Sequence, residues 1–152
     1  MRARVCLAVF ALLTVGFLVP PVAAQTTDAW IGTWTLNLAP KNQTTKITAA
    51  GDMLTAITDG ADADGKKVHT EITYKFDGKD YAYKGAPDAN SARVYTRVDD
   101  HHYTYSTKVN GSITTTSRVA VTPDGKTRTI TTTGRDAEGR VIRNFSVWNR
   151  AG

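Results

Sequence analysis

Cysteine and histidine are scarce in this 152-residue chain, and their scarcity excludes several kinds of chemistry. The only cysteine, Cys6, lies in an N-terminal segment that we expect to be removed, so the mature protein has no disulfide and no thiol nucleophile. Histidine occurs three times, at His69, His101 and His102. Because a metal ion needs several ligands in fixed geometry, and neighbouring strand residues point to opposite faces, we expect no metal site and no cofactor.

Long apolar runs are missing everywhere except near the N-terminus. There, Arg2 and Arg4 precede the apolar run Val5–Val19, which is shorter than the roughly 20 residues that cross a bilayer as a helix. Prolines and small residues follow at Pro20–Ala24. This pattern predicts a signal peptide over residues 1–24 and an exported protein, periplasmic or secreted, with no stable membrane anchor. An uncleaved anchor is the alternative.

Concentrated charge and catalytic motifs are missing as well. The net charge is +5, but the basic residues are dispersed singly, so we expect no nucleic-acid partner. The sequence has no Gly-x-Ser-x-Gly elbow, phosphate loop or dinucleotide fingerprint. We therefore expect a protein that is not an enzyme. The length of residues 25–152 suits one domain.

Apolar and polar residues alternate with a period of two in several segments, a pattern typical of strands with one buried face. In one segment Trp34, Leu36 and Leu38 alternate with polar residues. The even-numbered residues of 68–76 and the odd-numbered residues of 103–109 form two further series, and residues 113–121 and 141–150 behave likewise.

Glycine-containing turns separate these segments. Asn110-Gly111 has the composition of a two-residue hairpin turn, and Asp-Gly or Glu-Gly pairs punctuate other breaks. About ten short strands joined by hairpins predict an all-β fold, an antiparallel up-and-down meander that closes into a barrel of about 8–10 strands. A β-sandwich is the alternative.

The two ends of the mature chain resemble the lipocalin and fatty-acid-binding protein superfamily. Gly32-Thr33-Trp34 matches the Gly-x-Trp that opens the barrel in that family, where the tryptophan plugs the closed end, and Ser146–Arg150 matches its aromatic-centred last strand. The segments 76–81, 124–127 and 134–139 more specifically resemble those of small exported bacterial lipocalin-like proteins of unassigned function. The resemblance implies a lipocalin-like barrel and an arginine, Arg150 or Arg143, packed on Trp34.

Two departures from the family limit what the resemblance implies. Only residues 39–44 stand where fatty-acid-binding proteins have a helical lid. Ser146 and Trp148 stand where those proteins use Arg-x-Tyr to hold a carboxylate. A fatty acid held in that way is therefore not implied.

The interior of the barrel is the main candidate site. Residues on the same face as Trp34 suit a largely apolar pocket with a few polar groups, and we expect them to bind a small hydrophobic ligand. The expected ligand-binding residues are Trp34, Leu36, Tyr74, Phe76, Tyr103, Tyr105 and Trp148. The alternative is a filled barrel, an envelope structural or interaction module that meets a partner through the outer residues Arg93, Tyr95, Arg97 and His69.

Overall fold

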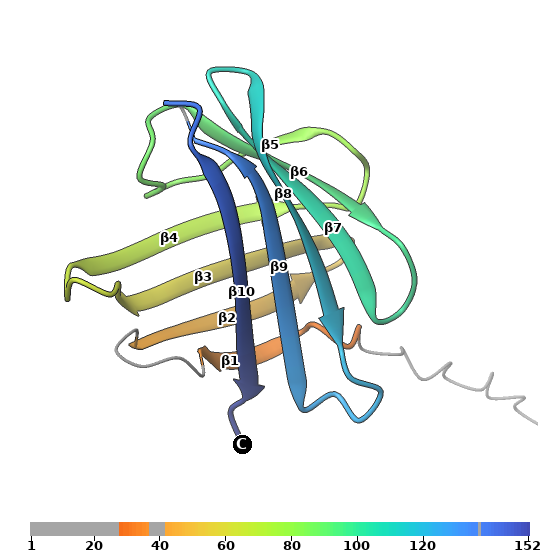
Figure 1. Ribbon diagram of the computed structural model, residues 1–152. Coiled ribbons are helices and arrows are strands. Elements are labelled where there is room, and N and C mark those ends of the chain that lie inside the picture. The colour runs from red at the N-terminus through yellow and green to blue at the C-terminus, as the bar shows by residue number, and fades with distance from the viewer. Residues whose placement is uncertain (1–27, 37–41, 137) are drawn as a thin grey trace, which may run out of the picture.

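The computed structural model describes residues 28–36, 42–136 and 138–152. The predicted signal peptide and its cleavage site lie outside these residues, as does Leu38. Every regular element among the described residues is a strand, and the ten strands form one antiparallel sheet (Figure 1). The strands are β1 (Gly32–Leu36), β2 (Asn42–Ala50), β3 (Met53–Ala61), β4 (Lys67–Tyr74), β5 (Asp80–Ala82), β6 (Ser91–Arg97), β7 (His102–Val109), β8 (Ser112–Val121), β9 (Thr127–Arg135) and β10 (Val141–Arg150).

The sheet curls into a nearly closed barrel. Its order, β4-β3-β2-β1-β10-β9-β8-β7-β6-β5, is an up-and-down meander in which the first and last strands pair. The remaining seam, between β4 and the end of β5, carries one bridge: the N–H of Glu71 donates to the carbonyl of Lys84 (3.1 Å), and the N–H of Lys84 donates back (3.0 Å). The predicted meander barrel is confirmed, and it is consistent with a lipocalin-like or fatty-acid-binding-protein-like fold.

The predicted alternation and turn chemistry are confirmed. In β1, Trp34 and Leu36 are buried while Thr35 is exposed, and in β4 the buried residues are Thr70, Ile72 and Tyr74. Asn110 and Gly111 join β7 to β8 with φ of 51° and 82°. Positive φ at both positions matches the two-residue turn whose twist suits a hairpin.

Trp34 plugs one end of the barrel, which we call the Trp34 end. Its indole is fully buried, and its Nε1 donates to the carbonyl of Trp30 (2.9 Å). The guanidinium of Arg150 lies 4.4 Å from the Trp34 ring and donates to the carbonyls of Ile31 (2.7 Å) and Ala29 (2.6 Å). Of the two expected arginines, Arg150 is therefore the one that packs on Trp34.

The glycine of the Gly-x-Trp motif makes this packing possible. Gly32 has φ of 140°, and a Cβ at this position would collide with the guanidinium of Arg150. Only glycine combines that backbone conformation with so close an approach. The motif thus allows Arg150 to reach across β1 to the carbonyls at the start of the described chain.

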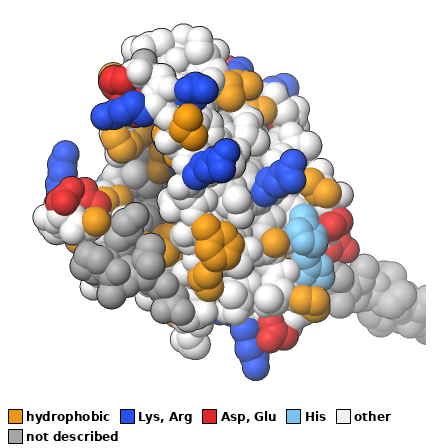
Figure 2. Space-filling view, viewed as in Figure 1, with side chains coloured by type: hydrophobic (Ala, Val, Ile, Leu, Met, Phe, Trp, Pro, Cys, Tyr) orange, Lys and Arg blue, Asp and Glu red, His pale blue; other side chains and the backbone are white. Residues whose placement is uncertain are grey.

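The basic residues are spread over the surface. On the face that Figure 2 shows, Lys and Arg side chains lie apart from one another among uncharged and hydrophobic side chains. The larger exposed apolar side chains include Ile113, Val141 and Phe145, on the outer side of β8 and β10.

Candidate functional site

A cavity of about 310 Å³ lies inside the barrel. This volume is at the lower end of the range for ligand pockets, so the space suits a small molecule. Strands from all around the barrel contribute to the lining, which combines aromatic rings with many Thr and Ser hydroxyls. The aromatic lining residues are Tyr74, Tyr83, Tyr95, Tyr103, Tyr105 and Trp148.

The expected ligand-binding residues divide into two groups. Tyr74, Tyr103, Tyr105 and Trp148 line the cavity. Trp34, Leu36 and Phe76 are not among the lining residues. Trp34 and Leu36 are buried in the hydrophobic core, and Phe76 packs against it, edge-on to Trp30 with ring centroids 5.2 Å apart.

Two arginines line the same cavity, and they change its character. Arg128 on β9 is 2% exposed, and its guanidinium carbon lies 5.1 Å from the ring of Trp34 and 4.9 Å from that of Trp148. Arg93 on β6 lies 3.7 Å from the ring of Tyr83 and 4.5 Å from that of Tyr105. Aromatic rings attract a guanidinium through their faces, and these contacts hold both side chains in place.

The hydrogen-bonding capacity of both arginines is incompletely used. The Nε–H of Arg93 and that of Arg128 are shielded from water and have no acceptor among the described residues. An aromatic face is a poor substitute for an oxygen acceptor, and a buried donor without one costs free energy.

The charges of the arginines are also unbalanced. The described residues that line the cavity include no Asp or Glu, and the ion pairs of the described chain join other residues, on the outside of the barrel. Burial raises the pKa of Tyr74, Tyr95 and Tyr103, so these phenols are neutral and do not offset the charge. Burial lowers the pKa of Arg128, but arginine keeps its proton in proteins. The lumen is therefore positively charged.

The expectation that Arg93 and Tyr95 lie on the outer face is wrong. Tyr95 is buried and pairs with Tyr105 in the β6–β7 ladder, and Arg93 pairs with Thr107, so both share the inner face with these β7 residues. The apolar residues Ala92 and Val94 take the other face. Hydrophobicity is a poor guide to direction in β6 because the interior that this strand faces is itself polar.

The other two expected outer residues are exposed. His69 pairs with Asp59 on β3 through Nδ1 (2.6 Å). Arg97 lies 4.9 Å from the ring of Trp30 and reaches Asp28 (2.8 Å) and Asp100 (2.9 Å).

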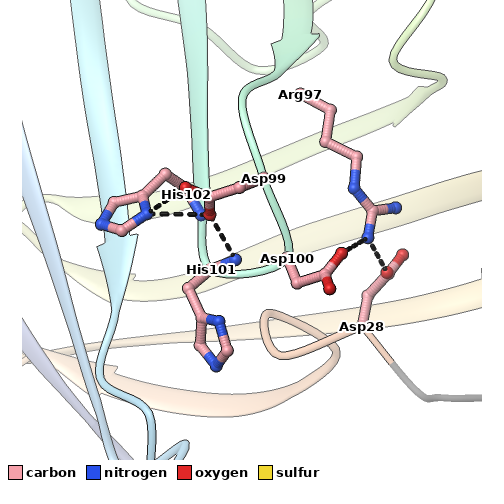
Figure 3. Close-up of polar contacts among 6 residues, drawn as sticks. All are labelled: Asp28, Arg97, Asp99, Asp100, His101 and His102. Atoms are coloured by element: carbon pink, nitrogen blue, oxygen red, sulfur yellow. Dashed lines mark hydrogen bonds and ion pairs between the residues drawn. The ribbon is translucent and has the colours of Figure 1, made fainter.

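Of the remaining histidines, His101 lies in the turn between β6 and β7 and His102 begins β7, and Asp99 binds the backbone of both (Figure 3). One carboxylate oxygen of Asp99 accepts from the N–H groups of His101 and His102 (2.8 Å each), and these bonds hold the pKa of that carboxyl below its usual range. The two imidazole rings point in different directions (Figure 3). No group of three or more potential metal-ligating side chains occurs within residues 28–36, 42–136 and 138–152.

No family model matches the chain, and no curated protein matches it. Among the residues described, there is no helix of the length and apolarity needed to span a bilayer. The cavity and its residues therefore provide the main indication of function.

Proposed function

We propose that this protein binds, inside its barrel, a small molecule that carries an anionic group, and that it does so without converting the ligand chemically. The observation that carries the proposal is Arg128: a guanidinium that is 2% exposed, has an Nε–H without an acceptor, and faces a cavity whose described lining has no carboxylate. A bound anion supplies the missing counter-charge.

The free energy of burying an unpaired charge supports this function. Withdrawing a guanidinium from water costs several kcal/mol unless a partner of opposite charge compensates. Folding alone gains little from such an arrangement, whereas a binding site needs a preorganised cation with free donors. The unligated protein then fills the cavity with water, for which about 310 Å³ leaves room for several molecules.

The proposed ligand is more polar than the largely apolar molecule that the sequence suggested. An anionic head satisfies Arg128, and a short apolar body packs on Ile47, Ile72 and Ile130, which also line the cavity. Aromatic rings and hydroxyls around the same space suit an amphipathic molecule. We further propose that the protein meets this ligand outside the cytoplasm, in keeping with the expected signal peptide.

A calorimetric titration with octanoate, a small amphipathic anion, tests the proposal. The expected result is saturable binding to the wild-type protein that Arg128→Met reduces by about tenfold or more, because a charge-assisted hydrogen bond is lost. Octanol is the matched neutral probe and is expected to bind far more weakly.

Arg118→Met is the matched control variant. Arg118 is exposed on the neighbouring strand β8, so this substitution removes the same charge without altering the lumen. Equal affinity of the Arg128 and Arg118 variants for octanoate, or equal affinity of the wild type for octanol and octanoate, would overturn the proposal.

A further inference from the structure

The backbone positions of the two lumenal arginines lie at different heights along the barrel. Along β6, Arg93 lies near the end marked by the Asn110-Gly111 turn, and the ladder places it level with Thr107, then with Thr115, then with Gly134 on β9. Arg128 lies at the other end of β9 and pairs with Trp148. Gly134 and Arg128 are six residues apart on one strand, which corresponds to about 20 Å at about 3.4 Å per residue.

The two side chains lie beside neighbouring tyrosines of the cavity. Arg93 lies near the phenol of Tyr95, and Arg128 near the phenol of Tyr103. The ring centroids of these two tyrosines are 6.3 Å apart. The guanidiniums therefore lie beside two neighbouring tyrosines that line the same cavity.

The aromatic contacts of the two arginines are separate. Tyr83 and Tyr105 hold Arg93, whereas Trp34 and Trp148 hold Arg128. Each guanidinium retains its own Nε–H without an acceptor among the described residues. An anionic group bound at one guanidinium therefore leaves the other without a counter-charge among the described lining residues.

We propose that the ligand is a dianion whose two anionic groups are separated by a short apolar spacer, with one group at Arg128 and the other at Arg93. This inference rests on the proposed function and specifies its ligand class. The spacer lies along the apolar part of the lining, for which Ile72 and Ile130 provide surface. Planar carboxylates suit both ends, because a guanidinium presents its donors in a plane.

Calorimetric titrations with paired acids test this inference in the wild-type protein. The probes are the dicarboxylates succinate, adipate, suberate and sebacate, each compared with the monocarboxylate of the same chain length, in a chloride buffer. We expect one intermediate dicarboxylate to bind about tenfold or more tightly than its monocarboxylate, since a second charge-assisted contact forms. Sulfate, a compact dianion without a spacer, is expected to bind more weakly than that dicarboxylate.

Substitutions test whether the second anionic group of the ligand binds Arg93. Arg93→Gln is expected to remove the advantage of the dicarboxylate over its monocarboxylate, because only the contact at Arg128 remains. Arg118→Gln, on the outer surface, is the control and is expected to retain the full advantage. Circular dichroism and a cooperative thermal transition establish that each variant is folded.

The outcomes distinguish this inference from the function on which it rests. The proposal of a ligand with two separated anionic groups is wrong if no dicarboxylate binds more tightly than its monocarboxylate, or if sulfate binds as tightly as the tightest dicarboxylate. In either case, octanoate binding still supports an anion site in the lumen. If neither kind of acid binds saturably, both proposals are wrong.

Discussion

The guanidinium of Arg128 lies 4.9 Å from the ring of Trp148, inside a barrel where the described lining offers it no carboxylate. Cation–π attraction of this kind contributes about 0.5–2 kcal/mol, which is less than the several kcal/mol that desolvating the charge costs. The packing of the pair therefore does not by itself offset the cost of burying the charge, which agrees with the anion site proposed above. Arg150 on Trp34 differs, because its guanidinium donates to backbone carbonyls and so stabilises the fold.

Replacing Arg128 with methionine is expected to stabilise the unligated protein while removing anion binding. Methionine has a similar volume and no charge, so the substitution relieves the desolvation cost and retains most of the packing. We expect a gain of about 1–3 kcal/mol in the free energy of unfolding, measured by urea denaturation. The exposed control Arg118→Met is expected to change stability by less than about 0.5 kcal/mol. A loss of stability on Arg128→Met would show that Arg128 is structural.

Replacing Arg150 with alanine is expected to have the opposite effect on stability. The substitution leaves the carbonyls of Ile31 and Ala29 without their donors and uncovers the Trp34 ring. We expect the free energy of unfolding to fall by about 2–4 kcal/mol and the tryptophan fluorescence to shift to the red. Arg143→Ala, at an exposed position of the same strand, is the control. Equal effects of the two substitutions would mean that the contact between Arg150 and Trp34 contributes nothing.

Alkaline pH is expected to destabilise the protein through its buried tyrosines. Burial raises the pKa of Tyr74, Tyr95 and Tyr103 in the folded state, whereas a phenol of the unfolded chain titrates near about 10. Above that pH the unfolded state binds fewer protons than the folded state, so stability is fully present below about pH 10 and falls as the pH rises further.

Phenolate absorbance and urea denaturation at a series of pH values measure this effect. The buried tyrosines are expected to ionise together with unfolding instead of before it. Early ionisation of every tyrosine in a protein that is still folded would contradict the burial of this aromatic group.

The seam between β4 and β5 is expected to be the most easily opened part of the barrel wall. One backbone bridge joins Glu71 to Lys84, just beyond β5, and their side chains form an ion pair (3.5 Å), whereas β9 and β10 pair along the whole of Val141–Asn149. Hydrogen exchange should therefore be faster at the amides of Glu71 and Lys84 than at those in the middle of β9 and β10. Ligand is expected to slow exchange at Lys84, because its neighbour Tyr83 lines the cavity. Uniform protection around the barrel would contradict this description of the seam.

The sequence predicted the strands and turns well because each depends on local chemistry. Alternation over residues 68–76 and the Asn110-Gly111 pair each specify a conformation without reference to the rest of the chain. The Gly-x-Trp opening likewise predicted the buried Trp34 and, through the resemblance, an arginine on its ring.

The candidate site was less predictable because its interior is polar. Alternation shows which residues share a face but not which face is inside, and hydrophobicity normally decides that question. In β6 the apolar residues Ala92 and Val94 lie opposite Arg93 and Tyr95, so hydrophobicity indicates the wrong face. Arg128 shares its face with Ile130, and that neighbour was the one local signal that an arginine points inward.

The measurement that tests the central claim most directly is nuclear magnetic resonance of the arginine side-chain Nε–H groups, assigned with the variants Arg93→Gln and Arg128→Met. In the free protein the Arg128 Nε–H is shielded from water and has no acceptor among the described residues. On titration with octanoate we expect its proton resonance to move downfield and to exchange more slowly with water, with saturation that follows the calorimetric curve. Movement confined to outer arginines such as Arg118, with the Arg128 resonance unchanged at saturation, would contradict an anion site inside the barrel.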